Sequence, residues 1–237
     1  MTPQKNDPSI RDGDIENKEL FESTYLSWKG WDEGAFGTLS REQQVYLSAQ
    51  LKDAECSIDQ EMNILEIGFG SGKFLAYASN LGAKITGIEV NLDLVNMGKK
   101  FGFDVHHTNS LSCFPKEKYD LVAAFDVLEH IPQENLIAFV EQVRDILRPG
   151  GRFLARFPNG DSPFGLINQN GDLTHVTSIG SSKIRHLAEA AGMEAIFIHG
   201  ESEPILAASG IFLLHRFFSK PIKAILNGFV NAVLKKN

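Results

Sequence analysis

Cysteine, basic side chains and long apolar runs are all scarce in this chain of 237 residues. Its two cysteines, Cys56 and Cys113, lie far apart, so we expect neither a disulfide framework nor a thiolate metal site. Acidic residues outnumber basic ones by 30 to 23, which disfavours general binding of nucleic acid because that needs a basic face. The apolar run at 204–214 is shorter than the roughly twenty residues that span a bilayer. We therefore expect a cytoplasmic protein in a reducing compartment.

The N-terminal part of the chain divides into a polar stretch and a helical one. Residues 1–20 carry no apolar core, so we expect a flexible arm there and neither a secretory signal nor a membrane anchor. A domain is expected over 21–217, with residues 21–53 as an N-terminal helical cap. The cap holds an aromatic group, Tyr25, Trp28 and Trp31. Such rings fit two roles, packing onto the domain or forming a lid over a ligand.

From Asn63 onward, short apolar runs alternate with helical patterns, which is typical of a parallel sheet with helices on both faces. Strands are predicted at 63–67, 85–89, 103–107, 119–125 and 151–157, with later runs at 194–199 and 210–215 to close the sheet. Helices are predicted at 72–80, 92–101, 133–147 and 181–191. The expected α/β fold is a Rossmann-like, mostly parallel sheet of seven strands, with an antiparallel final strand and helical extensions at both ends.

The segment Ile64–Leu75, ILEIGFGSGKFL, is the most informative part of the chain. A buried strand there runs into Gly68, Gly70 and Gly72 before a helix begins, and glycine permits the backbone angles and close approaches of a tight turn. The first turn of the helix offers unpaired N–H groups to a polar ligand. The next strand ends at Glu89, whose carboxylate can accept hydrogen bonds from both hydroxyls of a ribose. Nicotinamide enzymes use related glycine turns, so the turn alone predicts only a nucleoside cofactor.

A further buried strand, in YDLVAAFDVLEHI, ends in acidic residues and His130 at the sheet edge where open α/β sheets bind ligands. Together with the glycine turn and Glu89, this pattern resembles the class I S-adenosylmethionine-dependent methyltransferases over Asn63 to Gly192. The resemblance implies S-adenosyl-L-methionine as the cofactor. The cofactor-binding residues that it implies are Glu66, Gly68, Gly70, Gly72, Glu89, Asn109 and Asp126. Asn109 stands where the family usually has an aspartate that binds the adenine amino group.

A hydroxyl acceptor has to lose a proton, and His175 is the preferred base. It ends the long polar loop Asn159–His175, a kind of loop that often holds substrate. Asp172 lies three residues earlier and is expected to orient the imidazole. The alternative is that both residues cap the helix near Ser181 or stitch the loop. His130 is a further candidate, as a base or as a residue that orients the substrate.

The loop sequence is similar to that of methyltransferases of bacterial surface polysaccharide and O-antigen assembly. This similarity implies a sugar hydroxyl as acceptor, in a surface glycan or in a nucleotide-linked or lipid-linked precursor. A quinone or other small-molecule O-methyltransferase is the alternative, and some quinone enzymes with a similar Glu-His sequence use a divalent metal. Asp126, Glu129 and His130 would then be ligands, but we predict no metal because ligands on one turn do not by themselves make a site. A third alternative is a non-catalytic module that binds the cofactor and attaches to a membrane or partner.

The C-terminal segment 218–237 has a different charge from the rest of the chain, because no acidic residue follows Glu203. Apolar residues recur at helical spacing, which predicts a basic amphipathic helix from Lys220 to Leu234. Such a helix would cover the sheet of its own protein, lie on the inner face of an anionic membrane, or pack against a second subunit.

Overall fold

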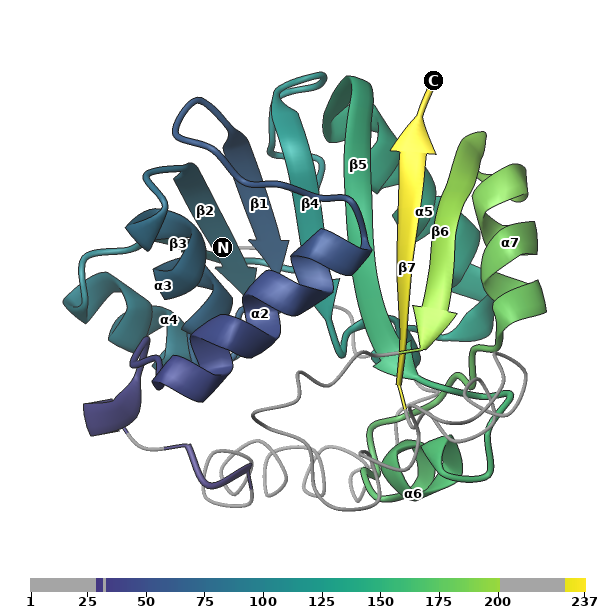
Figure 1. The fold of residues 1–237 in the computed structure, drawn as a ribbon, viewed down its shortest axis with the longest axis horizontal. Coiled ribbons are helices and arrows are strands. Elements are labelled where there is room, and N and C mark those ends of the chain that lie inside the picture. The colour runs from purple at the N-terminus through teal and green to yellow at the C-terminus, as the bar shows by residue number, and fades with distance from the viewer. Residues whose placement is uncertain (1–28, 32, 201–228) are drawn as a thin grey trace, which may run out of the picture.

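A seven-stranded sheet organises the computed structural model, which describes residues 29–31, 33–200 and 229–237 (Figure 1). The strands are β1 (Asn63–Ile67), β2 (Lys84–Glu89), β3 (Asp104–His107), β4 (Tyr119–Phe125), β5 (Leu147–Pro158), β6 (Met193–Gly200) and β7 (Phe229–Lys236). They lie in the order β3-β2-β1-β4-β5-β7-β6. The first five are parallel, whereas β7 runs antiparallel to both β5 and β6. The predicted Rossmann-like, mostly parallel sheet is therefore confirmed.

The helices cover both faces of this sheet. They are α2 (Arg41–Asp53), α3 (Lys73–Asn80), α4 (Leu92–Lys100), α5 (Leu136–Ile146), α6 (Gly165–Asn170) and α7 (Ser181–Ala190), with 3₁₀ turns η1 (Glu33–Ala35), η2 (Leu128–His130) and η3 (Gln133–Asn135). The four helices predicted within the domain match α3, α4, α5 and α7. Helix α6 was not predicted, because its six residues lie inside the polar loop that follows β5.

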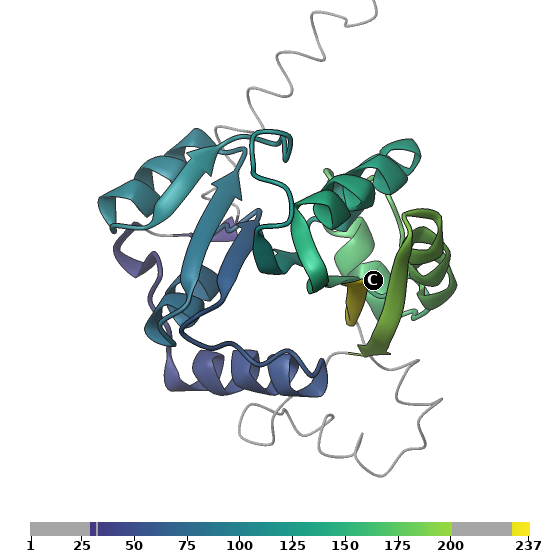
Figure 2. The same cartoon turned by 90° about the horizontal axis from the view of Figure 1, so that it is seen from above.

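Neighbouring residues of the central strands belong to different apolar cores, because side chains alternate between the two faces of a strand. Ile64 packs in the core that α2 and α3 share, and Leu65 packs in the core of α5 and α7. Figure 2 shows α2 on one side of the sheet and α5 on the other. With both faces covered, a strand reads as a nearly continuous apolar run, as the sequence of β4 does.

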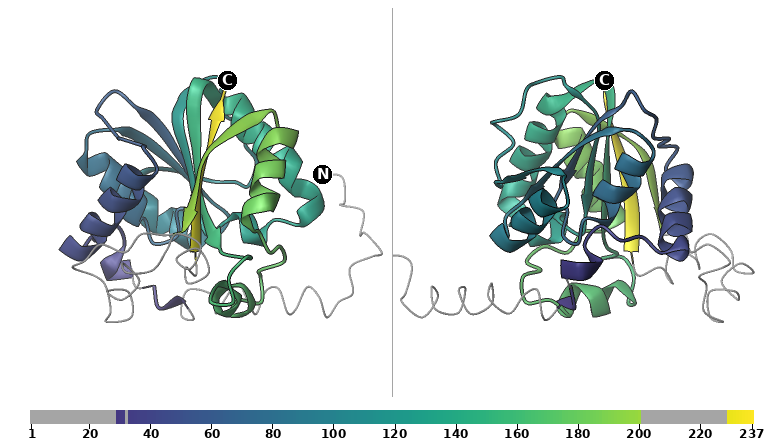
Figure 3. Two further views of the ribbon diagram at one scale, coloured as in Figure 1. Left: turned by 45° about the vertical axis from the view of Figure 1, so that its right-hand side comes forward. Right: turned by 90° about the vertical axis from the view of Figure 1, so that its left-hand side faces the viewer.

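The carboxyl ends of the parallel strands all point to one edge of the sheet, where α6 and η1 also lie (Figures 1 and 3). This is the edge at which open α/β sheets bind their ligands. Among the described residues, no helix combines the length and the apolar character needed to cross a membrane.

The C-terminal residues correct one prediction. Residues 229–236 form β7, so the helix predicted from Lys220 to Leu234 is wrong from Phe229 onward. β7 fills the position between β5 and β6, and its residues from Val230 to Leu234 are buried. Lys236 Nζ donates to the backbone oxygen of Leu147 at 2.8 Å, so this end of the basic tail pairs with its own protein. This part of the chain therefore offers no amphipathic face to a membrane or a second subunit.

Several predicted features lie outside the described residues. They are the arm at 1–20, the rings of Tyr25 and Trp28, the apolar run at 210–215 and the part of the predicted C-terminal helix before Phe229.

Gly165, the first residue of α6, allows a close contact between α6 and the end of β5. A Cβ atom added there would lie 2.0 Å from the backbone oxygen of Asn159, which is closer than atoms can approach. We expect Gly165→Ala to lower the midpoint of thermal unfolding by several degrees, because α6 has to move away from the backbone. Calorimetry measures this shift, with Gly102→Ala as the control: its added Cβ meets no atom within 4 Å and only its left-handed backbone is strained. If the two variants lowered the unfolding midpoint equally, the predicted clash between residue 165 and the backbone of Asn159 would be contradicted.

Candidate active site

The turn between β1 and α3 is built from three glycines in left-handed conformations. Gly68, Gly70 and Gly72 have φ values of 67°, 50° and 73°, which a residue with a side chain rarely adopts. The N–H of Gly68 donates to the backbone oxygen of Ile88 at 2.8 Å and so holds the turn against the end of β2.

Glu89, at the end of β2, is fixed beside this turn. Its Oε2 accepts from the N–H of Gly70 at 3.2 Å, and its Oε1 accepts from Val90 and Asn91 at 2.7 and 3.1 Å. The carboxylate is therefore held at the sheet edge, in the place predicted for contact with a ribose.

Glu66 lies in β1 next to Glu89 and is buried. Its Oε2 has no hydrogen-bond partner among the described residues. Burial, and after it the charge of Glu89, raises the pKa of Glu66 well above its usual value. A buried polar atom without a partner beside a ligand turn can be satisfied by a donor group of the ligand.

Asn109 lies two residues beyond the end of β3 and is exposed. The N–H of Thr108 donates to the backbone oxygen of Glu89 at 3.2 Å, which places this segment beside the end of β2. The ends of β1, β2 and β3 thus bring together six of the predicted cofactor residues, Glu66, Gly68, Gly70, Gly72, Glu89 and Asn109. Their contacts with a cofactor stay predictions.

Two rings of the N-terminal segment lie on the glycine turn. A Cβ atom at Gly70 would come within 2.8 Å of the Trp31 ring, and one at Gly72 within 2.6 Å of the Phe36 ring. The N–H of Gly37 also donates to the backbone oxygen of Ser71 at 2.9 Å. Of the two roles predicted for Trp31, the structure shows packing, and the packing is on the turn itself.

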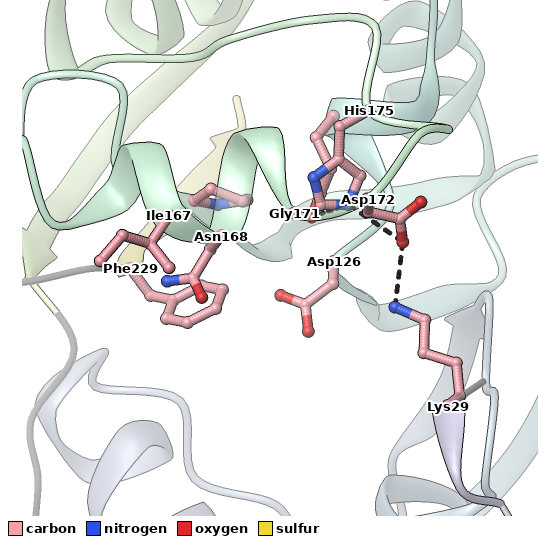
Figure 4. A pocket seen from close by; sticks show the side chains of 10 residues that line it. Lys29, Asp126, Ile167, Asn168, Gly171, Asp172, His175 and Phe229 are labelled. Carbon is pink, nitrogen blue, oxygen red and sulfur yellow. Dashed lines mark hydrogen bonds and ion pairs between the residues drawn. The ribbon is translucent and has the colours of Figure 1, made fainter.

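A pocket of about 250 Å³ opens at the same sheet edge, beyond β4 and β5 (Figure 4). It is lined by Lys29, Asp126, Glu129, Pro158, Ile167, Asn168, Gly171, Asp172, His175 and Phe229. The preferred base and its predicted partner thus line one pocket.

His175 is held in a defined orientation. Its Nδ1 lies 3.2 Å from the backbone oxygen of Gln169. A carbonyl oxygen can only accept a hydrogen bond, so Nδ1 carries the proton and Nε2 of the neutral ring has a lone pair. Nε2 lies 3.7 Å from Asp172 Oδ2 and 3.9 Å from Glu129 Oε1, which is too long for a hydrogen bond.

Asp172 is partnered differently from the prediction, because the backbone of Gln169 and not Asp172 holds Nδ1 of His175. Asp172 Oδ1 accepts from the N–H and the hydroxyl of Thr174 at 2.9 and 2.5 Å, and Oδ2 accepts from Lys29 Nζ at 3.1 Å. Burial alone would raise the pKa of Asp172, but the hydrogen bonds from Thr174 and Lys29 lower it to about 2. The carboxylate is therefore charged and can stabilise a positive His175 ring across 3.7 Å.

Of the two alternative roles for Asp172 and His175, the structure shows the stitching of the loop, since Asp172 bonds Thr174 and His175 bonds the backbone oxygen of Gln169. It does not show the capping of the helix near Ser181 by Asp172. The N–H of Ser181 donates to Asp161 Oδ2 at 2.6 Å, so Asp161 binds the start of α7.

His130 lies behind His175 and does not line the pocket. Its Nδ1 is 2.9 Å from the hydroxyl oxygen of Thr174, and its ring meets that of His175 edge to face, with centroids 4.6 Å apart. Burial, and after it the neighbouring His175, lowers the pKa of His130 and so favours its neutral ring. This position fits support of His175 better than contact with a substrate.

Glu129 is fully buried, and neither of its carboxyl oxygens has a hydrogen-bond partner in the described part of the chain. Burial, and after it the charge of Asp126, raises the pKa of Glu129 to about 8. Glu129, His130 and His175 each offer one possible metal-ligand atom, and these three atoms lie within 4.8 Å of one another. Among the described residues, no other such group of three is found. Two imidazoles and a carboxylate are ligands that zinc accepts. The absence of a metal stays a prediction.

Asp126 follows the end of β4 and lines the pocket, and its neighbour Val127 lies against Gly68 of the glycine turn. It has a positive φ of 57°, and Nε of Arg156 donates to its Oδ1 at 3.0 Å while Nη2 bonds the other oxygen. Arg156 Nη1 donates in turn to the hydroxyl of Tyr46 at 2.9 Å. The predicted contact between Asp126 and the cofactor stays a prediction.

Sequence reasoning missed two charged residues of the site. Arg156 has a local signal, since it interrupts the apolar run of β5, GRFLARF. Lys29 has none, because its partner Asp172 lies 143 positions away.

Comparisons with known proteins identify the family and agree with the fold. A family described as a methyltransferase domain matches residues 39–196, more than half of the chain. The ubiquinone biosynthesis O-methyltransferase of Bradyrhizobium sp. (strain ORS 278) is 24% identical over 168 residues, which cover 64% of this chain and 65% of that protein. The match thus spans slightly less than two thirds of that relative.

Two solved structures share the fold. A SAM-dependent methyltransferase from Archaeoglobus fulgidus superposes with a TM-score of 0.65 at 21% identity, covering 81% of this chain and 94% of that one. The 1,6-didemethyltoxoflavin-N1-methyltransferase of Burkholderia thailandensis, solved with bound S-adenosylhomocysteine, gives 0.59 at 15% identity, covering 98% and 93%. The chain therefore belongs to the methyltransferase-domain family.

Proposed function

We propose that this protein methylates a hydroxyl group of a small molecule held in the pocket beside His175. The observation that carries the proposal is the orientation of this ring. The backbone oxygen of Gln169 fixes the proton on Nδ1, so Nε2 is a base at the wall of the pocket.

The predicted cofactor residues lie at the same sheet edge as this base. Glu66, Glu89, Asn109 and the glycine turn would hold S-adenosylmethionine, which supplies a methyl group on a positively charged sulfur. Nε2 of His175 accepts the proton of the acceptor hydroxyl as its oxygen becomes the nucleophile. The charged Asp172 stabilises the resulting imidazolium, and the burial of both side chains keeps water from the proton.

Two classes of acceptor fit the lining of the pocket. Asn168, Asp172 and Lys29 offer polar atoms to several hydroxyls, which supports a sugar hydroxyl of a surface glycan or its precursor. Ile167 and Phe229 offer apolar surface, and the name of the Bradyrhizobium relative supports a phenolic acceptor, as in quinone synthesis, as the second candidate.

A methyl-transfer screen tests the proposal. Purified protein is incubated with S-adenosylmethionine and two panels, one of sugars and nucleotide sugars and one of dihydroxyphenols. Mass spectrometry follows S-adenosylhomocysteine and the O-methylated product, and we expect turnover with one panel. If the protein methylated amines or thiols and no hydroxyl compound, the choice of a hydroxyl acceptor would be overturned. Cofactor binding without turnover in any panel would favour the non-catalytic module.

A further inference from the structure

The N-terminal segment connects the two halves of the site. We call residues 29–31 and 33–37 the strap. We propose that Lys29 is a positioning residue that couples binding of the cofactor at the glycine turn to the arrangement of Asp172 in the acceptor pocket. The inference rests on the proposed function, because it takes the turn as the cofactor site and the surroundings of His175 as the acceptor site.

One end of the strap is seated on the glycine turn. The rings of Trp31 and Phe36 lie against Gly70 and Gly72, and Phe36 is buried among other rings of the same core. The hydrogen bond from Gly37 to Ser71 adds a backbone link of 2.9 Å. A ligand that fills the space beside the turn therefore contacts the strap or restricts its motion.

The other end of the strap reaches the acceptor pocket. Lys29 Nζ lies 3.1 Å from Asp172 Oδ2, and Figure 4 shows the lysine extending toward this carboxylate across the pocket. The side chain of Asp172 is 4% exposed and that of Lys29 is 28% exposed, so water screens this ion pair less than it screens a surface pair. Lys29 is the one basic side chain that lines the pocket among the described residues, His175 being neutral in its base form.

Asp172 connects Lys29 to the rest of the loop around His175. Its Oδ1 accepts two hydrogen bonds from Thr174, whose hydroxyl also meets Nδ1 of His130. Immediately after His175, the N–H groups of Val176 and Thr177 both donate to the backbone oxygen of Glu129, at 2.9 and 3.0 Å. Lys29 thus acts on His175 through Asp172 and the loop, without touching the imidazole.

Thermodynamic linkage turns this contact into a coupling between ligands. If cofactor binding restricts the motion of the strap, it also stabilises the ion pair between Lys29 and Asp172. That ion pair in turn stabilises the ordered conformation of the loop around His175. An acceptor that needs the ordered loop must then bind more tightly with the cofactor present, by the same factor as it tightens the cofactor. Without Lys29 the two sites remain but lose their connection.

Hydrogen exchange tests the coupling without knowledge of the acceptor. We expect S-adenosylhomocysteine to slow exchange of the amides of Thr174, Val176 and Thr177 in the unmodified protein. In Lys29→Met the affinity for S-adenosylhomocysteine, measured by calorimetry, should stay within about threefold, while the slowing disappears. Lys29→Arg should keep the slowing because it keeps the charge. Lys116→Met, which removes a lysine paired with Asp145 on the exposed surface, should behave as the unmodified protein.

The outcomes separate this inference from the proposed function. The coupling would be overturned if S-adenosylhomocysteine slowed amide exchange in the loop of Lys29→Met as much as in the unmodified protein. An unmodified protein that binds S-adenosylhomocysteine with no change in the loop would overturn it as well. Failure of the unmodified protein to bind S-adenosylhomocysteine would instead overturn the cofactor site on which both depend. In a double-mutant cycle, Asp172→Asn should lose the slowing as Lys29→Met does, and the double variant should lose no more.

Discussion

His175→Ala is expected to bind S-adenosylhomocysteine normally while the rate of methyl transfer falls by about 10²–10⁴-fold, the usual contribution of a general base. The loss follows from the removal of Nε2, the base that the proposal places at the pocket wall. Calorimetry with S-adenosylhomocysteine measures binding, and release of S-adenosylhomocysteine at a saturating concentration of the acceptor found in the screen measures the rate.

His186→Ala is the matched control for this prediction, because His186 is exposed on α7 and does not line the pocket. It should keep the full rate. His130→Ala should lose less than His175→Ala, since His130 lies behind the ring that lines the pocket. A fully active His175→Ala enzyme would remove this residue from the chemistry and with it the basis for choosing a hydroxyl acceptor.

Gly70→Val is expected to abolish binding of the cofactor. Valine is strained at a φ of +50°, and its Cβ would lie 2.8 Å from the Trp31 ring, so either the turn or the ring has to move. Moving the turn also breaks the bond from the N–H of Gly70 to Glu89, the residue predicted to hold the ribose. Calorimetry with S-adenosylmethionine and S-adenosylhomocysteine measures the loss.

Gly150→Val separates a local effect on the site from a general cost of backbone strain. Gly150 also has a positive φ, of +76°, but an added Cβ there meets no atom within 4 Å. This variant should bind the cofactor, and circular dichroism should show both variants folded. Unimpaired binding by a folded Gly70→Val protein would move the cofactor away from the glycine turn.

Most of the fold could be predicted because its signals are local. β1, β2, β4 and the second half of β5 contain apolar runs ended by turns, and α3, α4, α5 and α7 show helical periodicity, so these elements can be recognised within about a dozen residues. β7 could not be recognised in this way. Its residues FVNAVLKK are covered on both faces, so they lack the polar alternation of a half-exposed strand. Its strand conformation depends on pairing with β5 and β6, which lie far from it in the sequence.

In the candidate site, too, features with a local sequence signal could be predicted and contacts between distant segments could not. The positions of Glu89 and the glycine turn were predictable because both follow the ends of strands that the sequence itself indicates. The surroundings of His175 were predicted only in part: Asp172 lies beside it, but its partners are Thr174 and Lys29. Such partners come from distant segments, and spacing along the chain carries no information about them. The lack of partners for Glu129 likewise appears only once burial is known.

The place of β7 has a consequence for the synthesis of the protein. Residues 229–236 pair with β5 and with β6, so both of these strands have an open edge until the ribosome has made this late segment and it has left the exit tunnel. During that interval the nascent chain exposes unpaired backbone on strands rich in apolar residues, which is the form most exposed to aggregation and to capture by chaperones. Shortening the chain to residue 228 should therefore reduce the soluble yield more than it would for a protein whose late strand lies at a sheet edge.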